Sequence, residues 1–303
     1  MSSNDTAVRE PGGAGRLGAH RVARIGFGAM QLTEAHGRPP ISKETAVAIL
    51  RTVVEQGVNH IDTADFYGTA ALNSNDLIRA ALHPYPENLA IATKVGAVRD
   101  RSGTLVPAQR PQELRASVEA NLARLGAERV ALVNLRRVDG RPGIVAEGDQ
   151  IVDIESQLAE LAALRDEGKI DAIGLSSVTA EQLRQALPVG IACVQNLHSL
   201  VDRTSEPVLD VCREHDVAWV PFFPLGSAFP GLPKVTDQPA VQAAAAALGA
   251  TPAQIGLAWL LAHYEGTLLI PGTANPDHLA ENIAAGDVRL DPETLKELDQ
   301  ITA

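Results

Sequence analysis

The stretch HIDTADFYG, residues 60–68, joins a strand-like apolar segment to a group of polar side chains. The apolar segment ends at Ile61, Asp62 follows at once, and Tyr67 comes five residues after Asp62. In parallel α/β proteins, side chains at the carboxyl ends of strands face the site where ligands bind. The stretch therefore predicts a strand that ends at an active site, where a carboxylate and a phenol act together.

The rest of the chain repeats this strand-to-helix alternation. Strand-like segments are expected at 22–28, 58–63, 88–94, 129–135, 170–175, 191–196, 217–222 and 267–271. Helices, with apolar residues at three- and four-residue spacing, are expected at 43–56, 73–82, 111–125, 151–167, 179–187, 205–215, 252–264, 276–285 and 292–301. Eight alternations favour an α/β fold of the (β/α)8 TIM-barrel type, with its active site at the carboxyl ends of the strands. A doubly wound sheet, the alternative, usually has fewer strands.

The chain shows no internal linker or composition break, so we expect a single barrel domain over residues 21–303. Residues 1–20 are expected to form a flexible N-terminal arm or a short hairpin that closes the barrel floor. Residues 13–18, GAGRLG, match the G-x-G-x-x-G dinucleotide-binding pattern. That pattern requires a strand before it and a helix after it, whereas here a polar tail precedes it and a strand-like segment follows. A glycine-rich turn is the better interpretation.

The amino-acid composition disfavours several classes of binding partner. Lys and Arg total 26 against 37 Asp and Glu, a net charge of −11, which disfavours binding to nucleic acid or anionic membranes. Cys193 and Cys212 lack metal-ligand spacing and lie in apolar segments, as core side chains do. The polar N-terminus has no signal-peptide core, and no apolar run approaches the roughly 20 residues of a membrane span. We expect a cytoplasmic protein that acts on a small molecule, with no metal; the oligomeric state stays open.

Lys94 ends the third strand-like segment, IATK, and could meet Asp62 and Tyr67 in the barrel mouth. A free tyrosine has a pKa near 10, and a neighbouring ammonium lowers it. We expect Asp62 to hold Lys94 charged, and Tyr67 to give its proton to a carbonyl oxygen as a hydride reaches the carbon. Two alternatives are a merely structural ion pair and a Schiff-base lysine at Lys94 in an aldolase-like barrel.

Several motifs in register resemble the aldo-keto reductases from about residue 22 to the end. They are HIDTADFYG, IATKVG, GLSSVT, the segment around Gln195, FFPLG and IPGTANPDHLAEN. The resemblance implies a (β/α)8 barrel that uses NADP(H) without a Rossmann domain. It also implies the NADPH-dependent reduction of an aldehyde or ketone, with Tyr67 as the general acid and Asp62 and Lys94 tuning it.

The same resemblance implies a cofactor site. Ser176 and Gln195 would hold the nicotinamide carboxamide, and Phe222 would stack on the nicotinamide ring. The other implied cofactor-binding residues are Ala29, Met30, Asp62, Pro224, Leu225, Gly226, Ser227, Pro271, Gly272, Thr273, His278, Glu281 and Asn282. NADPH is the expected cofactor. NADH stays open, because Gly272 and His278 stand where many family members carry lysine and arginine.

The sequence departs from the family pattern at the end of the fourth strand. Arg136, in ALVNLRR, stands where the family usually has a histidine. Arginine stays protonated, so it could stabilise an oxyanion or bind an anionic group but could not relay a proton. The alternatives are an Arg136 turned away into a salt bridge and a barrel that binds NADP(H) with little or no catalysis. In addition, Ser177 replaces an asparagine that is common beside the carboxamide.

Three segments are similar to a bacterial branch of the family that includes pyridoxal reductases. They are ALVNLRR, VPFFPLG and LIPGTAN. This similarity makes pyridoxal a candidate substrate.

Overall fold

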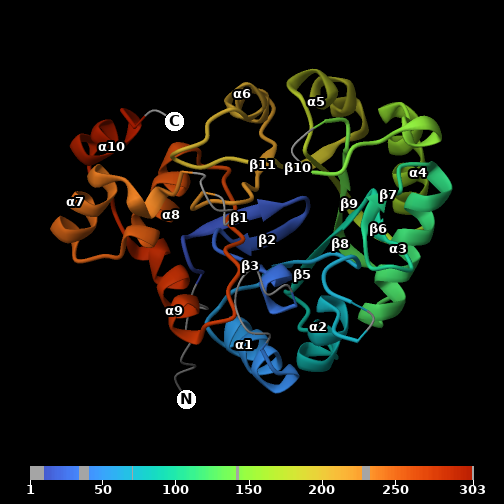
Figure 1. Ribbon diagram of the computed structural model, residues 1–303, viewed down its shortest axis with the longest axis horizontal. Coiled ribbons are helices and arrows are strands. Elements are labelled where there is room, and N and C mark those ends of the chain that lie inside the picture. The colour runs from blue at the N-terminus through green and yellow to red at the C-terminus, as the bar shows by residue number, and fades with distance from the viewer. Residues whose placement is uncertain (1–9, 34–40, 70, 141–142, 227–232, 302–303) are drawn as a thin grey trace, which may run out of the picture.

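The computed structural model describes residues 10–33, 41–69, 71–140, 143–226 and 233–301. Seven parallel strands form one curled sheet in the order β11-β10-β9-β8-β5-β4-β3. They are β3 Phe27–Gly28, β4 His60–Asp62, β5 Ala90–Val95, β8 Val130–Arg136, β9 Ile170–Ser176, β10 Ile191–Gln195 and β11 Ala218–Trp219. The ring closes because Thr267 pairs in parallel with Trp219 and Leu269 pairs in parallel with Ile25. The predicted barrel is confirmed (Figure 1).

Helices surround the ring (Figure 1). They are α1 Lys43–Glu55, α2 Ser74–Leu82, α3 Pro111–Leu125, α4 Ile154–Asp166, α5 Ala180–Ala186, α6 Glu206–Glu214, α7 Pro239–Leu248, α8 Pro252–His263, α9 Pro276–Ala284 and α10 Pro292–Asp299. Thr179 and Thr251 each open a helix with a capping box, in which side chains satisfy the free amides of the first turn. Within the described residues no single helix is long and apolar enough to cross a membrane; α7 and α8 together are, but they bend by 96° at their junction.

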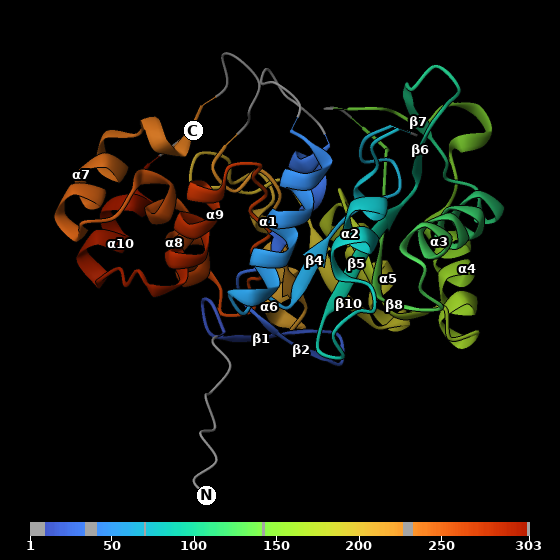
Figure 2. The ribbon, with the colours of Figure 1, turned by 90° about the horizontal axis from the view of Figure 1, so that it is seen from below.

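An antiparallel hairpin lies across the barrel floor, at the amino ends of the strands (Figure 2). Its strands are β1 Ala14–Leu17 and β2 His20–Ala23, so the glycine-rich stretch forms a strand and a turn. Leu17 and Val22 enter the ring and pack on small buried side chains, among them Ala90, Ala92, Ala172, Cys193 and Ala218. The expected strand at 22–28 is therefore wrong in part, because residues 22–23 belong to this hairpin.

A second hairpin rises above the opposite end of the barrel (Figure 2). It is formed by β6 Ala97–Arg99 and β7 Leu105–Pro107, in a segment where the sequence predicted neither a strand nor a helix. Asp100 closes its turn, because one carboxylate oxygen accepts hydrogen bonds from the amides of Ser102 and Thr104.

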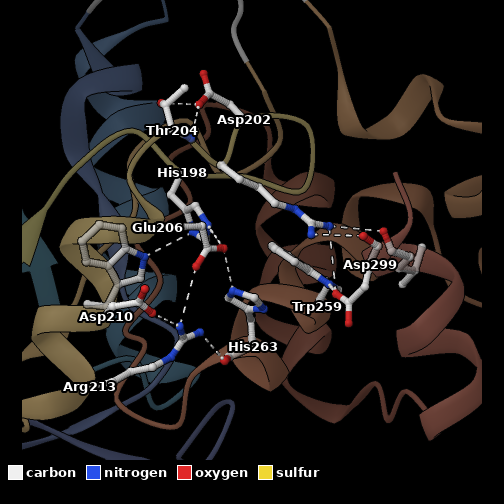
Figure 3. A network of polar contacts seen from close by, with 12 residues as sticks. His198, Asp202, Thr204, Glu206, Asp210, Arg213, Trp259, His263 and Asp299 are labelled. Carbon is white, nitrogen blue, oxygen red and sulfur yellow. Dashed lines mark hydrogen bonds and ion pairs between the residues drawn. The ribbon is translucent and has the colours of Figure 1, made fainter. Parts of the chain in front are cut away.

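Glu206 joins the ends of β10 and β11 to α6 and α8 through a partly buried polar network (Figure 3). Its Oε1 lies 3.0 Å from His198 Nε2 and 2.8 Å from His263 Nε2. Burial alone would raise the pKa of Glu206, but the two histidine hydrogen bonds outweigh it and hold the pKa below its usual range.

The spacing of His198, Glu206 and His263 resembles that of metal ligands, but the hydrogen bonds favour a proton network. His198 Nδ1 lies 3.3 Å from Trp219 Nε1, and an indole N–H can only donate. The proton of a neutral His198 therefore sits on Nε2 and is donated to Glu206. A metal on Nε2 would need that proton on Nδ1, where it would face the indole N–H.

Replacing Glu206 by glutamine tests this network. We expect Glu206→Gln to lower the free energy of unfolding by about 1–2 kcal/mol at neutral pH, because charge-assisted hydrogen bonds are lost. A depressed carboxyl pKa contributes stability above its ordinary value of 4.5 and loses that contribution as the pH falls. The deficit measured by urea denaturation should therefore shrink in acid. Asp210→Asn, which alters an exposed pair with Arg213, should change stability by less than about 0.5 kcal/mol; equal effects of the two variants would contradict the assignment.

Candidate active site

A cavity of about 360 Å³ opens at the carboxyl ends of the strands. Its described walls come from nearly every strand and from the loops after β3 and β11. They are Gly28, Met30, Gln31, Asp62, Tyr67, Lys94, Arg136, Ser176, Ser177, Gln195, Phe222, Phe223, Pro224, Leu225, Gly226, Ile270, Pro271, Gly272 and Asn282. The cavity thus brings together all four expected catalytic residues, at the end of the barrel where the fold predicts a site.

A buried ion pair occupies the floor of the cavity. The Lys94 ammonium on β5 donates to Asp62 Oδ1 on β4, and Gln195 Nε2 on β10 donates to Asp62 Oδ2 at 2.7 Å. Burial opposes the charge of Lys94, but Asp62 prevails, so the pKa of Lys94 is raised above its usual value. A Schiff-base lysine must lose its proton to act as a nucleophile; this environment keeps Lys94 protonated and disfavours the aldolase-like alternative.

Tyr67 lies against this pair. Lys94 Nζ is 5.1 Å from the centre of the Tyr67 ring, and the Phe66 ring meets the tyrosine edge-on at 5.3 Å. Burial raises the pKa of Tyr67 and exceeds the lowering by Lys94. The expectation of a lowered pKa is therefore wrong, because burial outweighs the effect of Lys94 and the negative charge of Asp62 acts in the same direction as burial. The phenol is fully protonated at neutral pH.

The loop that carries Tyr67 is held by its own backbone. The Tyr67 amide donates to the Ala64 carbonyl at 3.0 Å, and the Ser74 amide at the start of α2 donates to the Tyr67 carbonyl at 3.2 Å. Gly68 has a φ of +94°, and a Cβ there would lie 2.1 Å from the Leu72 carbonyl oxygen. Only glycine allows this tight passage.

Arg136 ends β8 with its half-buried side chain on the cavity wall. Its guanidinium carbon lies 5.8 Å from the Phe66 ring, and its positive charge acts to lower the pKa of Tyr67. The neighbouring Arg137 is the one turned away, in a two-pronged ion pair with Asp139 at 2.9 and 2.6 Å. Arg136 therefore faces the cavity, contrary to the alternative of an arginine turned away from it.

The part of the cavity wall formed by the ends of β9 and β10 and by the segment after β11 fits a primary amide and a flat ring. Gln195 is 1 % exposed, and among the described residues its Oε1 has no hydrogen-bond partner; such an oxygen can accept an amide N–H. Ser176 and Phe222 line the same cavity. Ser177 adopts a left-handed φ of +59°, a conformation for which asparagine is better suited than serine. These groups suit the nicotinamide carboxamide of the expected cofactor.

The other expected cofactor residues fall into three groups. Met30, Pro224, Leu225, Gly226, Pro271, Gly272 and Asn282 line the cavity. Ala29, Thr273, His278 and Glu281 do not: Ala29 and Thr273 are buried behind the wall, whereas His278 and Glu281 lie along α9. Ser227 lies outside the described residues.

Sequence reasoning missed Gly28, Gln31, Phe223 and Ile270 on the cavity wall. A Cβ on Gly28 would lie 2.6 Å from the Ile270 carbonyl oxygen, and one on Gly272 would lie 2.4 Å from the Gly28 carbonyl oxygen. The two glycines thus let the first and last strands of the ring approach closely. The glycines of GFG and IPG were the available signal.

Comparison with known proteins agrees with this geometry. The model of the aldo/keto reductase family matches residues 24–303. Pyridoxine 4-dehydrogenase of Escherichia coli (strain K12) is 41 % identical over 288 residues, which cover 94 % of this chain and 97 % of that one. An oxidoreductase of Schizosaccharomyces pombe is 36 % identical over 95 % of this chain and 89 % of its own.

Two solved structures extend the comparison. A thermostable aldo-keto reductase in complex with the inhibitor epalrestat has a TM-score of 0.78 and 27 % identity, over 94 % of this chain and 98 % of that one. An aldo/keto reductase of Klebsiella pneumoniae in complex with NADP and acetate has a TM-score of 0.76 and 25 % identity, over 95 % and 94 % of the two chains. With its barrel, its cavity and a family match over nearly its whole length, this chain belongs to the aldo/keto reductase family of NAD(P)H-dependent oxidoreductases.

Proposed function

We propose that this protein uses NADPH to reduce an aldehyde or ketone to the alcohol, with Tyr67 as the proton donor. The observation that carries the proposal is the phenol of Tyr67 beside the buried Lys94–Asp62 pair, in a cavity that Gln195 also lines. NADPH, when bound, supplies the hydride to the carbonyl carbon.

In this proposal four polar side chains of the cavity take part in proton transfer or support it. The Tyr67 hydroxyl donates a hydrogen bond to the carbonyl oxygen and then transfers its proton as negative charge develops there. Lys94 and Arg136 stabilise the phenolate that is left behind, since both stay positively charged. Asp62 holds Lys94 in place and also accepts from Gln195, so it links the proton donor to the residue that would bind the carboxamide.

The preference for NADPH rests on the relatives and on α9. The Klebsiella pneumoniae relative contains NADP. In this chain Thr273, His278, Glu281 and Asn282 would surround the adenosine end, and the free amides at the start of α9 would face phosphate. Ala29 would support that wall from behind, and Ser227 would complete the pyrophosphate segment.

Pyridoxal is the substrate that we propose. The name of the Escherichia coli relative describes the dehydrogenation of pyridoxine at position 4, and the reverse reaction reduces the pyridoxal aldehyde. Pyridoxal carries an acidic ring hydroxyl next to its aldehyde. The guanidinium of Arg136 would hydrogen-bond this oxygen and favour its anion, while Tyr67 contacts the neighbouring carbonyl.

Removal of the phenolic hydroxyl tests the proton donor. Tyr67→Phe should lower turnover of pyridoxal by about 10²–10⁴-fold, the usual contribution of a positioned acid, and leave NADPH affinity little changed. NADPH oxidation and fluorescence titration measure the two quantities. Near-normal turnover would exclude Tyr67 as the acid. If the wild-type protein binds NADPH tightly but does not oxidise it when an aldehyde, a ketone or pyridoxal is added, the non-catalytic alternative would be favoured instead.

The raised pKa of Tyr67 predicts a flat pH profile. Reduction needs the protonated phenol, and the protonated fraction falls only as the pH approaches a pKa above 10. With benzaldehyde, which does not ionise, kcat/KM at saturating NADPH should be constant from about pH 6 to 9. A fall in kcat/KM with an apparent pKa near neutrality would contradict the assignment if substitution of each other titratable cavity residue left that fall in place, because the titration would then belong to Tyr67.

Arg136 substitutions test substrate recognition. Arg136→Gln should lower kcat/KM for pyridoxal about 10–100-fold more than for benzaldehyde, because only pyridoxal offers a hydroxyl for a charge-assisted hydrogen bond. Arg136→Lys, which keeps the charge but not the planar fork, should lie between. Equal losses on the two aldehydes would show that Arg136 acts on the carbonyl or on Tyr67, and not on the ring hydroxyl.

A further inference from the structure

Behind β4 and β5, on the side that faces the helices, five polar side chains form a connected and wholly buried cluster. They are Thr63, Ser74, Asn75, Thr93 and Asn121, each 0 % exposed; we call them the rear network. Helix–strand interfaces are normally apolar, and a buried polar group costs free energy unless it is hydrogen-bonded. Such a cluster in this place therefore calls for a specific geometric explanation.

Asn121 on α3 is the centre of the rear network. Its Oδ1 accepts from Thr93 Oγ1 at 2.5 Å and from Asn75 Nδ2 at 2.8 Å. Its Nδ2 donates to the Ser117 carbonyl at 2.8 Å. One side chain thus ties β5 to both α2 and α3.

Thr63 extends the rear network to β4 and to the Tyr67 loop. Its hydroxyl donates to Asn75 Oδ1 at 2.8 Å and lies 2.8 Å from Ser74 Oγ. Ser74 in turn contacts the loop after β4, because its Oγ donates to the Ala64 carbonyl at 3.3 Å and its amide donates to the Tyr67 carbonyl at 3.2 Å.

Each contact of the rear network falls next to a reactive residue. Thr63 follows Asp62, and Thr93 precedes Lys94. Successive side chains of a strand point to opposite faces, so the threonines point at the helices while Asp62 and Lys94 point into the cavity. Hydrogen bonds are directional, whereas apolar contacts tolerate sliding; the network therefore fixes both strands where the ion pair must form.

We infer that Asn121 is a positioning residue that sets the geometry of Asp62, Lys94 and Tyr67 from behind the barrel wall; the inference rests on the proposed function of that triad. Small displacements of reacting groups are costly, since a shift of about 1 Å can reduce a rate about 100-fold. None of the five residues of the rear network lines the cavity, so the loss of the network should act on turnover and spare binding.

The test compares Asn121→Leu with Val118→Ala. Val118 lies on the same helix, is also 0 % exposed and belongs to the apolar core, so its truncation destabilises the protein without touching the network. We expect Asn121→Leu to lower kcat for pyridoxal about 10–100-fold with the NADPH dissociation constant unchanged. Val118→Ala should keep the wild-type kcat at temperatures where circular dichroism shows both variants folded. Equal kcat values in the two variants would overturn the inference.

A second variant separates positioning from stability. Replacing four of the five residues of the rear network by apolar residues of similar shape (Thr63→Val, Asn75→Leu, Thr93→Val and Asn121→Leu) removes the hydrogen-bonding partners of Asn121 together with it, which can restore stability. Ser74 is kept, because its hydroxyl still donates to the Ala64 carbonyl. We expect its Tm to recover relative to Asn121→Leu while kcat stays low. Recovery of kcat along with Tm would reduce the rear network to a structural role.

A readout without turnover keeps this inference distinct from the proposed function. The chain has three tyrosines, so the NMR signal of a 13C-labelled Tyr67 ring can be assigned by its loss in Tyr67→Phe. It should shift in Asn121→Leu and not in Val118→Ala. A wild-type protein that reduces no carbonyl would refute the proposed function, while an unmoved Tyr67 signal would refute the positioning role.

Discussion

The Lys94–Asp62 pair places two opposite charges inside the mouth of a barrel, and the surrounding structure must compensate for the water that they have lost. Removing one charge from water costs several kcal/mol unless its partner and further hydrogen bonds are in place. Asp62 meets this demand with Lys94 on one oxygen and Gln195 on the other. Three different strands thus converge on one carboxylate, and their relative positions are constrained by electrostatics as well as by packing.

This constraint explains why a neutral phenol fits beside two cations. Asp62 offsets Lys94, so burial decides the protonation of Tyr67 and keeps its proton in place. Arg136 adds a second positive charge on the cavity wall, which also acts to lower the pKa of Tyr67. The site therefore stabilises negative charge only when it forms, which is the arrangement that favours a transition state over a ground state.

Much of the architecture could be predicted from the chain. The alternation of short apolar segments with periodic helices indicated the ring, and the polar residues that end each strand indicated the cavity. The floor hairpin was harder, because residues 22–28 read as one strand, although residues 22–23 belong to the strand at 20–23 that pairs with residues 14–17. The hairpin at 97–107 depends on side-chain contacts of Asp100 within its turn, which spacing does not reveal.

The detailed site was less predictable, for physical reasons. The pKa of Tyr67 is a balance between burial and three nearby charges, and burial cannot be read from spacing. The resemblance identified a set of cofactor residues but not which of them reach the cavity. His278 and Glu281 occupy the same helix as Asn282, yet only Asn282 faces the wall of the cavity. The packing of α9 sets its orientation, and this orientation determines which of its side chains reach the cavity.

The hairpin under the barrel also has a practical meaning for anyone who handles this enzyme. This hairpin lies at the end of the barrel away from the cavity (Figure 2), where Arg21 donates to the Glu10 carboxylate and Leu17 and Val22 fill the ring. A resin or fluorophore attached to the exposed face of this hairpin, for example at position 21, would therefore lie away from the entrance. Immobilisation through that end should leave the passage of cofactor and substrate unobstructed.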